Sequence, residues 1–207
     1  MNRRFLLLLL FTLGASPVAS AQQPPGPPPE SPTPVWLPRA ALLSTYLRKG
    51  VVAPGARVQW QVPFYRGRRD SLSLSIEPTA AFAVAFPDNV EDDPNTFIRE
   101  DVPLSALRLY ALVLGVGYSN RLESGLEWGF QIGTGPAWYS ARFSAGEKSR
   151  ESYLVGLLDG RAQLGYRFGA VSLGVAVGYS DPYNYRRTSQ ARGHVGGLQL
   201  GVYADWR

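Results

Sequence analysis

The last stretch of the chain alternates strictly between two kinds of side chain. In residues 198–206 every even position is apolar, whereas the odd positions carry Gln, Gly, Tyr and Asp. Successive side chains of a β-strand point to opposite faces, so this segment has one apolar face and one face of small or polar residues. A helix would repeat its apolar positions every three to four residues instead. The ending therefore predicts an amphipathic strand.

The same alternation recurs along the chain and predicts about eight strands. We expect them at residues 36–47, 56–66, 71–86, 104–118, 122–143, 152–168, 170–183 and 192–206. No apolar stripe of helical period and useful length interrupts them. Several are longer than the ~9 to 11 residues that cross a bilayer obliquely, so their ends should project beyond it. The sequence thus predicts an all-β fold.

The N-terminus has the features of an export signal. Arg3 and Arg4 precede an apolar run at residues 5–13, and small residues follow at 19–21. This order is typical of a cleavable signal peptide, which we expect to occupy residues 1–21. A membrane anchor is the alternative, but the apolar run is far shorter than the roughly 20 residues that a spanning helix needs.

A Pro-rich segment follows the signal peptide. Residues 22–34 read QQPPGPPPESPTP and offer almost no apolar side chains. Such a composition predicts an extended, polyproline-like linker over residues 22–35. It is either a passive spacer or a docking peptide for a periplasmic partner.

Composition excludes several classes of function. The chain has no cysteine, which excludes a lipid on an N-terminal cysteine, disulfides, thiolate metal sites and a cysteine nucleophile. Its 21 basic and 16 acidic side chains are interspersed. No long basic block is present that would follow a phosphate backbone, so the sequence predicts no nucleic-acid partner.

The connections between the expected strands alternate in length. Those at 67–70, 119–121 and 169 are tight, whereas those at 87–103, 144–151 and 180–191 are longer and polar. Transmembrane barrels sort their connections in this way, with short periplasmic turns and longer external loops. An even number of strands then leaves both termini, and the Pro-rich linker, in the periplasm.

The polar face of each strand indicates which side is the interior. It carries mostly Gly, Ala and Ser, and the whole chain has only two lysines, Lys49 and Lys148. Small side chains suit the narrow interior of an eight-stranded barrel, so the apolar face should meet lipid. We expect aromatic girdles at the two membrane boundaries, with candidates Tyr118 and Trp206 at one and Tyr110 and Trp138 at the other.

The leader, the alternating strands, the sorted connections and the ending LQLGVYADW together resemble the small bacterial outer-membrane β-barrel family of outer-membrane protein A and X type. The resemblance covers residues 36–207. It implies an eight-stranded antiparallel up-and-down transmembrane β-barrel in the cell outer membrane, in contact with its lipid. It also implies that the barrel-assembly machinery recognises the last strand through Leu198, Leu200, Val202 and Trp206.

Polar side chains on the expected inward face predict a network inside the barrel. They are Gln61, Glu77, Glu127, Asp159, Arg161 and Gln163, which we expect at mid-barrel height. Charges removed from bulk water need partners, so acids and a base at one level indicate an internal network of ion pairs and hydrogen bonds. The network either fills the barrel or gates a narrow channel for ions or small solutes.

Enzymatic and metal sites have weaker support. His194 is the only histidine, with Ser189, Asp181 and Asp205 as candidate partners at the external rim, where lipid headgroups lie. However, no serine lies two residues after His194, as in lipid A deacylases, and no GxSxG motif occurs. The acidic run 91–93 lacks the spacing of a defined calcium loop.

We therefore expect a non-enzymatic, monomeric protein with a structural or surface-interaction role and no cofactor. A narrow channel is the first alternative. A lipid-modifying enzyme is the second alternative, and a soluble exported barrel with an apolar interior is the third.

Overall fold

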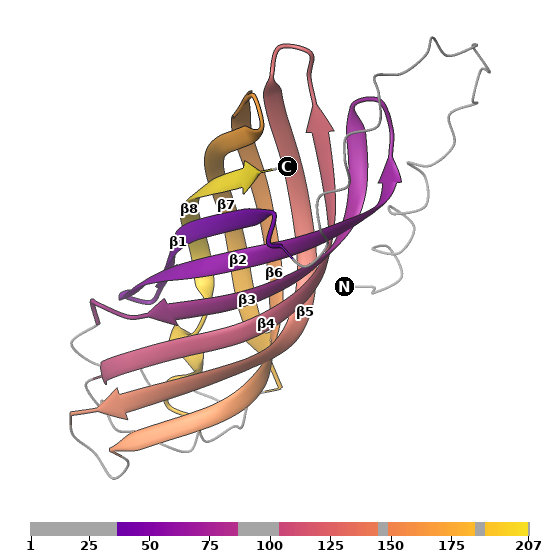
Figure 1. Ribbon diagram of the computed structural model, residues 1–207. Coiled ribbons are helices and arrows are strands. Elements are labelled where there is room, and N and C mark those ends of the chain that lie inside the picture. The colour runs from indigo at the N-terminus through magenta and orange to yellow at the C-terminus, as the bar shows by residue number, and fades with distance from the viewer. Residues whose placement is uncertain (1–36, 87–103, 145–148, 185–188, 207) are drawn as a thin grey trace, which may run out of the picture. The chain divides into compact units, whose positions relative to one another are not determined.

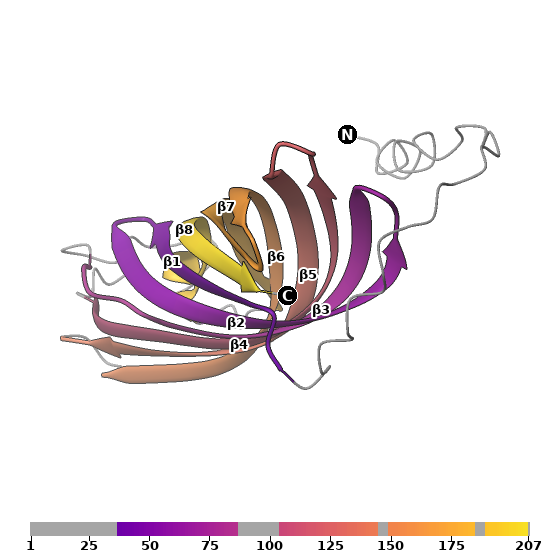
Figure 2. The same ribbon diagram turned by 45° about the horizontal axis from the view of Figure 1, so that its top comes forward.

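Eight strands of the computed structural model close into one barrel, and the structure describes residues 37–86, 104–144, 149–184 and 189–206. The elements are β1 (Ala40–Arg48), β2 (Val51–Arg66), β3 (Asp70–Phe82), β4 (Leu104–Arg121), β5 (Leu126–Phe143), β6 (Arg150–Phe168), β7 (Val171–Tyr183), the 3₁₀ turn η1 (Arg192–His194) and β8 (Gly197–Trp206). Each strand pairs with its neighbours in sequence, as Figure 1 shows. β8 pairs antiparallel with β1 and closes the ring (Figure 2). The predicted fold class is confirmed.

No helix among the described residues is long and apolar enough to cross a membrane.

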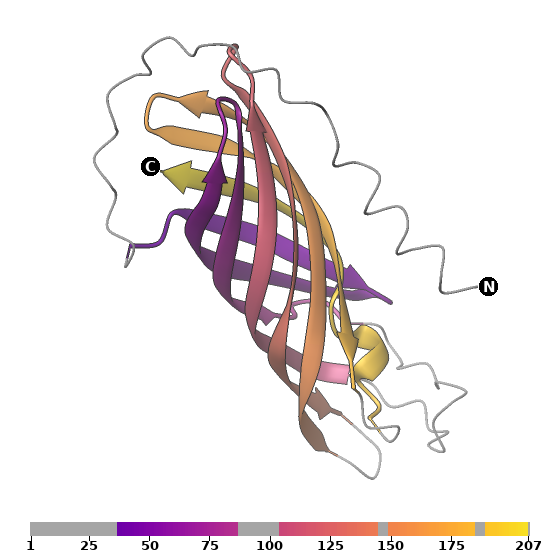
Figure 3. The same cartoon turned by 90° about the vertical axis from the view of Figure 1, so that its right-hand side faces the viewer.

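Apart from the β1–β2 turn, the connections are sorted by length between the two ends of the barrel. The β2–β3, β4–β5 and β6–β7 turns gather at one end, and η1 lies at the other (Figure 3). We call the first the tight-turn end and the second the long-connection end. The sequence predicts this sorting. According to that prediction, the long-connection end faces the cell exterior and the tight-turn end faces the periplasm.

The first connection at the long-connection end differs from the prediction. β1 and β2 are joined by a two-residue turn, Lys49 and Gly50, both with positive φ (46° and 81°). Such turns match the twist of the strands that they join. β2 therefore begins at Val51 rather than at residue 56. Pro54 is tolerated inside β2 because it lies beyond the last residue pair of the β2–β3 ladder, Gly55 with Ala81, where a proline nitrogen removes no ladder bond.

The last strand also begins later than expected. Residues 192–194 form η1, and β8 starts at Gly197. Gly196 and Gly197 have φ values of 78° and 104°, which side chains other than glycine rarely adopt. These two glycines turn the chain from the connection into the strand.

The outer face of the barrel is a continuous apolar surface. Its exposed side chains include Val62, Leu74, Ile76, Leu114, Phe130, Ile132, Leu164, Val175 (58% exposed), Val177, Leu200 and Val202. Water would disfavour such an area, whereas a bilayer matches it. The assignment of the apolar face to the outside is confirmed.

Aromatic side chains lie toward both ends of this apolar surface. At the long-connection end, Tyr110 stacks on Trp138 with 5.5 Å between ring centroids. At the other end, Tyr118 contacts Trp128 at 5.4 Å. These are positions at which aromatic girdles mark membrane boundaries.

Small residues on the inner face let the strands and their side chains approach closely. A Cβ atom on Gly174 would lie 2.6 Å from Cε1 of Tyr203 and still nearer to the Leu164 carbonyl oxygen. The glycine thus leaves room for the ring of Tyr203, which reaches across from the neighbouring strand β8.

Candidate functional site

The interior of the barrel is filled at two heights. Toward the long-connection end, inward side chains form one apolar cluster, which we call the apolar layer. It comprises Tyr46, Val51, Ala53, Ala81, Leu104, Leu107, Leu109, Ala111, Val113, Ala137, Tyr139, Ala141, Phe143, Val155, Leu157, Ala191 and Val195. All but the last two come from strand segments next to the long-connection end.

Residues of the connection between β7 and β8 complete the apolar layer on the side of the long-connection end. Ala191 and Val195 are buried in it. Glu151 of β6 fixes this connection by accepting hydrogen bonds from the backbone nitrogen of Ala191 at 2.8 Å and from Ser189 Oγ at 2.9 Å. A second hydroxyl, that of Tyr139, lies 2.5 Å from Ser189 Oγ. The stretch from Ser189 to Val195 is therefore part of the packed interior.

Charged side chains occupy the next level, at mid-height, and we call them the ionic layer. Arg57 of β2 donates from Nη1 to Glu77 Oε2 at 2.9 Å and to Asp159 Oδ1 at 2.8 Å. Its Nη2 donates to Asp159 Oδ2 at 2.9 Å and to the Tyr46 hydroxyl at 3.1 Å. Asp159 thus receives the two parallel hydrogen bonds that a guanidinium makes with a carboxylate in its strongest geometry.

A second arginine completes the ionic layer. Arg161 of β6 donates from Nη1 to Glu77 Oε2 at 2.8 Å and from Nη2 to Gln131 Oε1 at 2.6 Å. Its Nη1 also lies 3.9 Å from Asp159 Oδ1. Two guanidinium groups therefore face two carboxylates, and the formal charge of the four side chains sums to zero.

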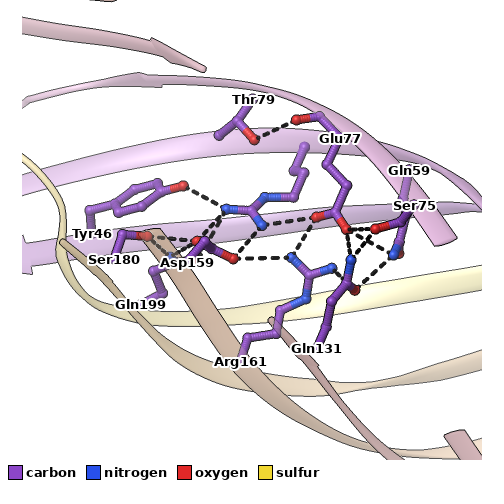
Figure 4. Close-up of polar contacts among 11 residues, drawn as sticks. Tyr46, Gln59, Ser75, Glu77, Thr79, Gln131, Asp159, Arg161, Ser180 and Gln199 are labelled. Atoms are coloured by element: carbon purple, nitrogen blue, oxygen red, sulfur yellow. Dashed lines mark hydrogen bonds and ion pairs between the residues drawn. The ribbon is translucent and has the colours of Figure 1, made fainter. Parts of the chain in front are cut away.

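Amides and hydroxyls saturate the remaining acceptor positions, as Figure 4 shows. Glu77 Oε1 accepts from Gln59 Nε2 at 3.0 Å and from Ser75 Oγ at 2.9 Å. Asp159 Oδ2 accepts from Ser180 Oγ and from Gln199 Nε2, each at 2.6 Å. Of the buried side-chain atoms in this layer that the structure describes, Arg57 Nε is the one without a hydrogen-bond partner. The hydrogen-bonded network, with Tyr46 included, is contributed by seven of the eight strands, all but β4.

Five of the six network residues predicted from sequence separate into two groups. Glu77, Asp159 and Arg161 meet in the ionic layer. Gln61 and Gln163 line a small cavity on its tight-turn side, together with Tyr203 and Asp205.

Glu127 does not lie at mid-height, and this part of the prediction is wrong. It is the second residue of β5 and forms an ion pair with Arg121 near the tight-turn end. The strand was expected to begin at residue 122, and its later start at Leu126 moves Glu127 to the end of the barrel.

The prediction from sequence omits Arg57, whose guanidinium group bonds both buried carboxylates of the network. Arg57, Gln59 and Gln61 occupy alternate positions of one predicted strand, so the alternation already placed all three on one face. The polar partners Gln131 and Gln199 were missed as well. Their contacts depend on which residues of distant strands lie at the same height.

The candidate catalytic residues do not assemble into a catalytic site. His194 is only 3% exposed and packs against the apolar layer, where burial and the nearby Lys49 and Arg48 lower its pKa to about 4. Asp181 pairs instead with Arg48, at 2.8 Å. Asp205 lies near the end of β8, at the opposite end of the barrel from His194.

The described ranges contain no group of three side chains that would hold a metal ion. The acidic run 91–93 lies outside the described residues. In the last strand, Leu198, Leu200 and Val202 point outward, and Trp206 is half-buried.

Solved structures place this architecture among known folds. The outer-membrane enzyme PagL superposes with a TM-score of 0.52 at 10% sequence identity, over 80% of this chain and 97% of PagL. This chain has the fold of the small outer-membrane barrels. Neisserial surface protein A matches with a TM-score of 0.47 at 10% identity, over 81% of this chain and 94% of that protein. Ail of Yersinia pestis matches with a TM-score of 0.43 at 13% identity, over 81% and 93%.

No family model and no curated protein sequence matches the chain. At 10% identity, the likeness to PagL concerns the fold and carries no site residue across.

Proposed function

We propose that this chain is a non-conducting, non-enzymatic outer-membrane barrel with a structural or surface-interaction role. The observation that carries the proposal is that its interior is filled at two successive heights, by the ionic layer and by the apolar layer. Such a barrel acts through what it presents at the surface and through its contact with the membrane.

The filled interior argues against the alternative of a narrow channel. A permeating ion would first have to separate Arg57 and Arg161 from their carboxylates, which are bonded at 2.8 to 2.9 Å. It would then have to cross the apolar layer, whose described side chains are mostly aliphatic or aromatic and replace little of its water shell. Two unlike barriers in series oppose conduction more strongly than either one alone.

The burial of the candidate nucleophile and base argues against an enzyme. Ser189 Oγ is bonded to Glu151 and lies against the Tyr139 hydroxyl, and His194 lies below the surface. A nucleophile has to reach its substrate, and a base has to reach the nucleophile. The likeness to PagL is a likeness of fold and adds nothing to this alternative.

The location follows from the outer face and the expected leader. The apolar belt supports insertion into a membrane, and the likeness in fold supports an outer membrane. We infer export through the signal peptide at 1–21, a periplasmic linker at 22–35, insertion by the barrel-assembly machinery and a monomeric state.

Conductance across a planar bilayer tests the proposal. The mature chain, residues 22–207, is refolded in detergent, and folding is checked by gel mobility before and after boiling. We expect no stepwise current. Sustained single-channel openings would contradict the proposal.

A double variant, Arg57→Ser with Glu77→Ser, sharpens the experiment. It removes one charge of each sign from the ionic layer and leaves the apolar layer intact. We expect the folded variant to remain closed. If it conducts while the native chain does not, the apolar layer is not a barrier.

A further inference from the structure

Three arginines gather on the outward face near the long-connection end. Arg108 of β4, Arg142 of β5 and Arg150 of β6 are all exposed and line one concavity together with Trp138 and Ser140. Arg142 lies directly opposite Arg150, and Arg108 lies directly opposite Ser140, two residues before Arg142 on the same face. Three guanidinium groups from adjacent strands therefore share one small area, which we call the arginine cluster.

The described side chains around the arginine cluster do not balance its positive charge. In the ranges that the structure describes, none of the three arginines forms an ion pair with a carboxylate, although Arg48, Arg57, Arg69, Arg121 and Arg161 all do. Like charges directly opposite each other on paired strands are destabilising. An anion held between Arg142 and Arg150 would remove this repulsion.

The position of the arginine cluster along the barrel axis shows whether an anion bound there would meet water or lipid. Trp138 pairs in register with Tyr110 and stacks on it, one step along the outward face from Ser140 and Arg108. Stacked aromatic residues of this kind mark the membrane–water boundary. Leu154, 72% exposed, lies opposite Trp138, and the apolar belt continues from there toward the tight-turn end. The cluster thus lies at headgroup level, in contact with the lipid-facing surface.

We propose that the arginine cluster binds a phosphate group carried by a lipid of the outer leaflet. Guanidinium groups match phosphate oxygens through paired hydrogen bonds, which lysine does not reproduce. A lipid suits the position better than a soluble anion, because the acyl chains of a lipid cover Trp138 and Leu154 while its phosphate meets the arginines. The proposal goes beyond the role proposed above and rests on the outward face meeting lipid and on the long-connection end being external.

The test is a titration of the refolded mature chain, in detergent micelles, with lipid A as the phosphorylated probe. Bound lipid is counted by native mass spectrometry. Each basic side chain near an anionic surface strengthens binding several-fold, so we expect R108Q/R142Q/R150Q to bind about a hundredfold more weakly than the native chain. R66Q/R68Q is the matched control, because both arginines are exposed at the tight-turn end. It should bind like the native chain.

Two further probes distinguish a lipid from a free anion, using the native chain alone. Lipid A stripped of its phosphates should bind as weakly as the phosphorylated lipid binds the triple variant. Inorganic phosphate should compete poorly, because it lacks the acyl chains. Equal binding of the stripped lipid, effective competition by inorganic phosphate, or equal weakening in R66Q/R68Q would each overturn the proposal.

Discussion

The two layers inside this barrel achieve closure by opposite physical means. The apolar layer packs like the core of a soluble protein, with Leu157 and Tyr139 fully buried. The ionic layer, directly beneath it, holds Arg57, Glu77, Asp159 and Arg161 almost without exposure. The free energy of the first depends on how well its volume is filled. That of the second depends on every charge keeping its partner.

This difference indicates how each layer should respond to change. Loss of volume in the apolar layer leaves a cavity whose cost grows with its size, so substitutions there should have graded effects. Loss of one carboxylate in the ionic layer leaves two buried arginines facing a single carboxylate, so the effect should be abrupt. Four experiments test this comparison and its consequences.

The largest effect is expected from Glu77→Ala in the ionic layer. Glu77 accepts from Arg57 at 2.9 Å and from Arg161 at 2.8 Å, and its loss leaves two buried cations against one carboxylate. We expect the free energy of unfolding to fall by ~3–5 kcal/mol. Urea unfolding of the barrel in micelles measures it. Glu123→Ala, which breaks an exposed pair with Arg69, should cost less than ~1 kcal/mol, and equal losses would contradict the account.

Leu157→Ala probes the apolar layer at a fully buried position. We expect a loss of ~2–5 kcal/mol from the removed contacts and the cavity, measured in the same unfolding experiment. Leu157→Met conserves volume and should cost less than ~1.5 kcal/mol. If both substitutions cost the same, the layer does not depend on packing and the comparison between the layers fails.

Val175→Arg extends the comparison to the outer face. Val175 is the fifth of the 13 residues of β7 and is 58% exposed, so the new charge would face the hydrocarbon of the bilayer. We expect a loss of ~2–4 kcal/mol for the barrel refolded in lipid vesicles. Leu154→Arg places the same charge beside the girdle residue Trp138 and should cost only ~0–1 kcal/mol. A loss at Leu154 as large as that at Val175 would refute the assigned membrane depth.

The smallest effect concerns pH and the connection that completes the apolar layer. The pKa of His194 is lowered from its ordinary value of 6.5 to about 4, first by burial and then by the charges of Lys49 and Arg48. Between these values the opened connection binds a proton that the closed one does not, so closure weakens as pH falls through 6.5. Hydrogen exchange at the His194 amide, which donates to the Ala191 carbonyl at 2.9 Å, should report this opening. His194→Gln should remove the pH dependence, and its persistence in that variant would assign it to another group.

The fold could be predicted from the sequence because the two faces of each strand meet different surroundings. Lipid outside and a narrow interior impose an alternation that is visible in residues 171–183 and 198–206 without any structural information. The β1–β2 turn could not be predicted in the same way. Pro54 and Gly55 are typical of a loop, and only the position at which the β2–β3 ladder stops explains why β2 continues through them.

The sequence predicts which side chains point into the barrel, but not the level along the barrel axis at which each one lies. Alternation places Glu77, Asp159 and Arg161 inward, and the structure brings these three together. The height of Glu127 and the partners of Arg57 depend on the stagger between strands, which is a property of the closed barrel. Alternation within one strand carries no information about that stagger.

The central claim is that one face of each strand meets lipid and the other closes the interior. The native chain has no cysteine, so single cysteines along β7 can each carry a spin label. Labels at the outward positions 173, 175 and 177 should be relaxed by oxygen dissolved in the bilayer. Labels at the inward positions 172 and 176, which carry Ser and Ala in the native chain, should be shielded from oxygen and from water-soluble nickel complexes. Inward labels that meet the nickel complex, or outward labels shielded from oxygen, would contradict the account.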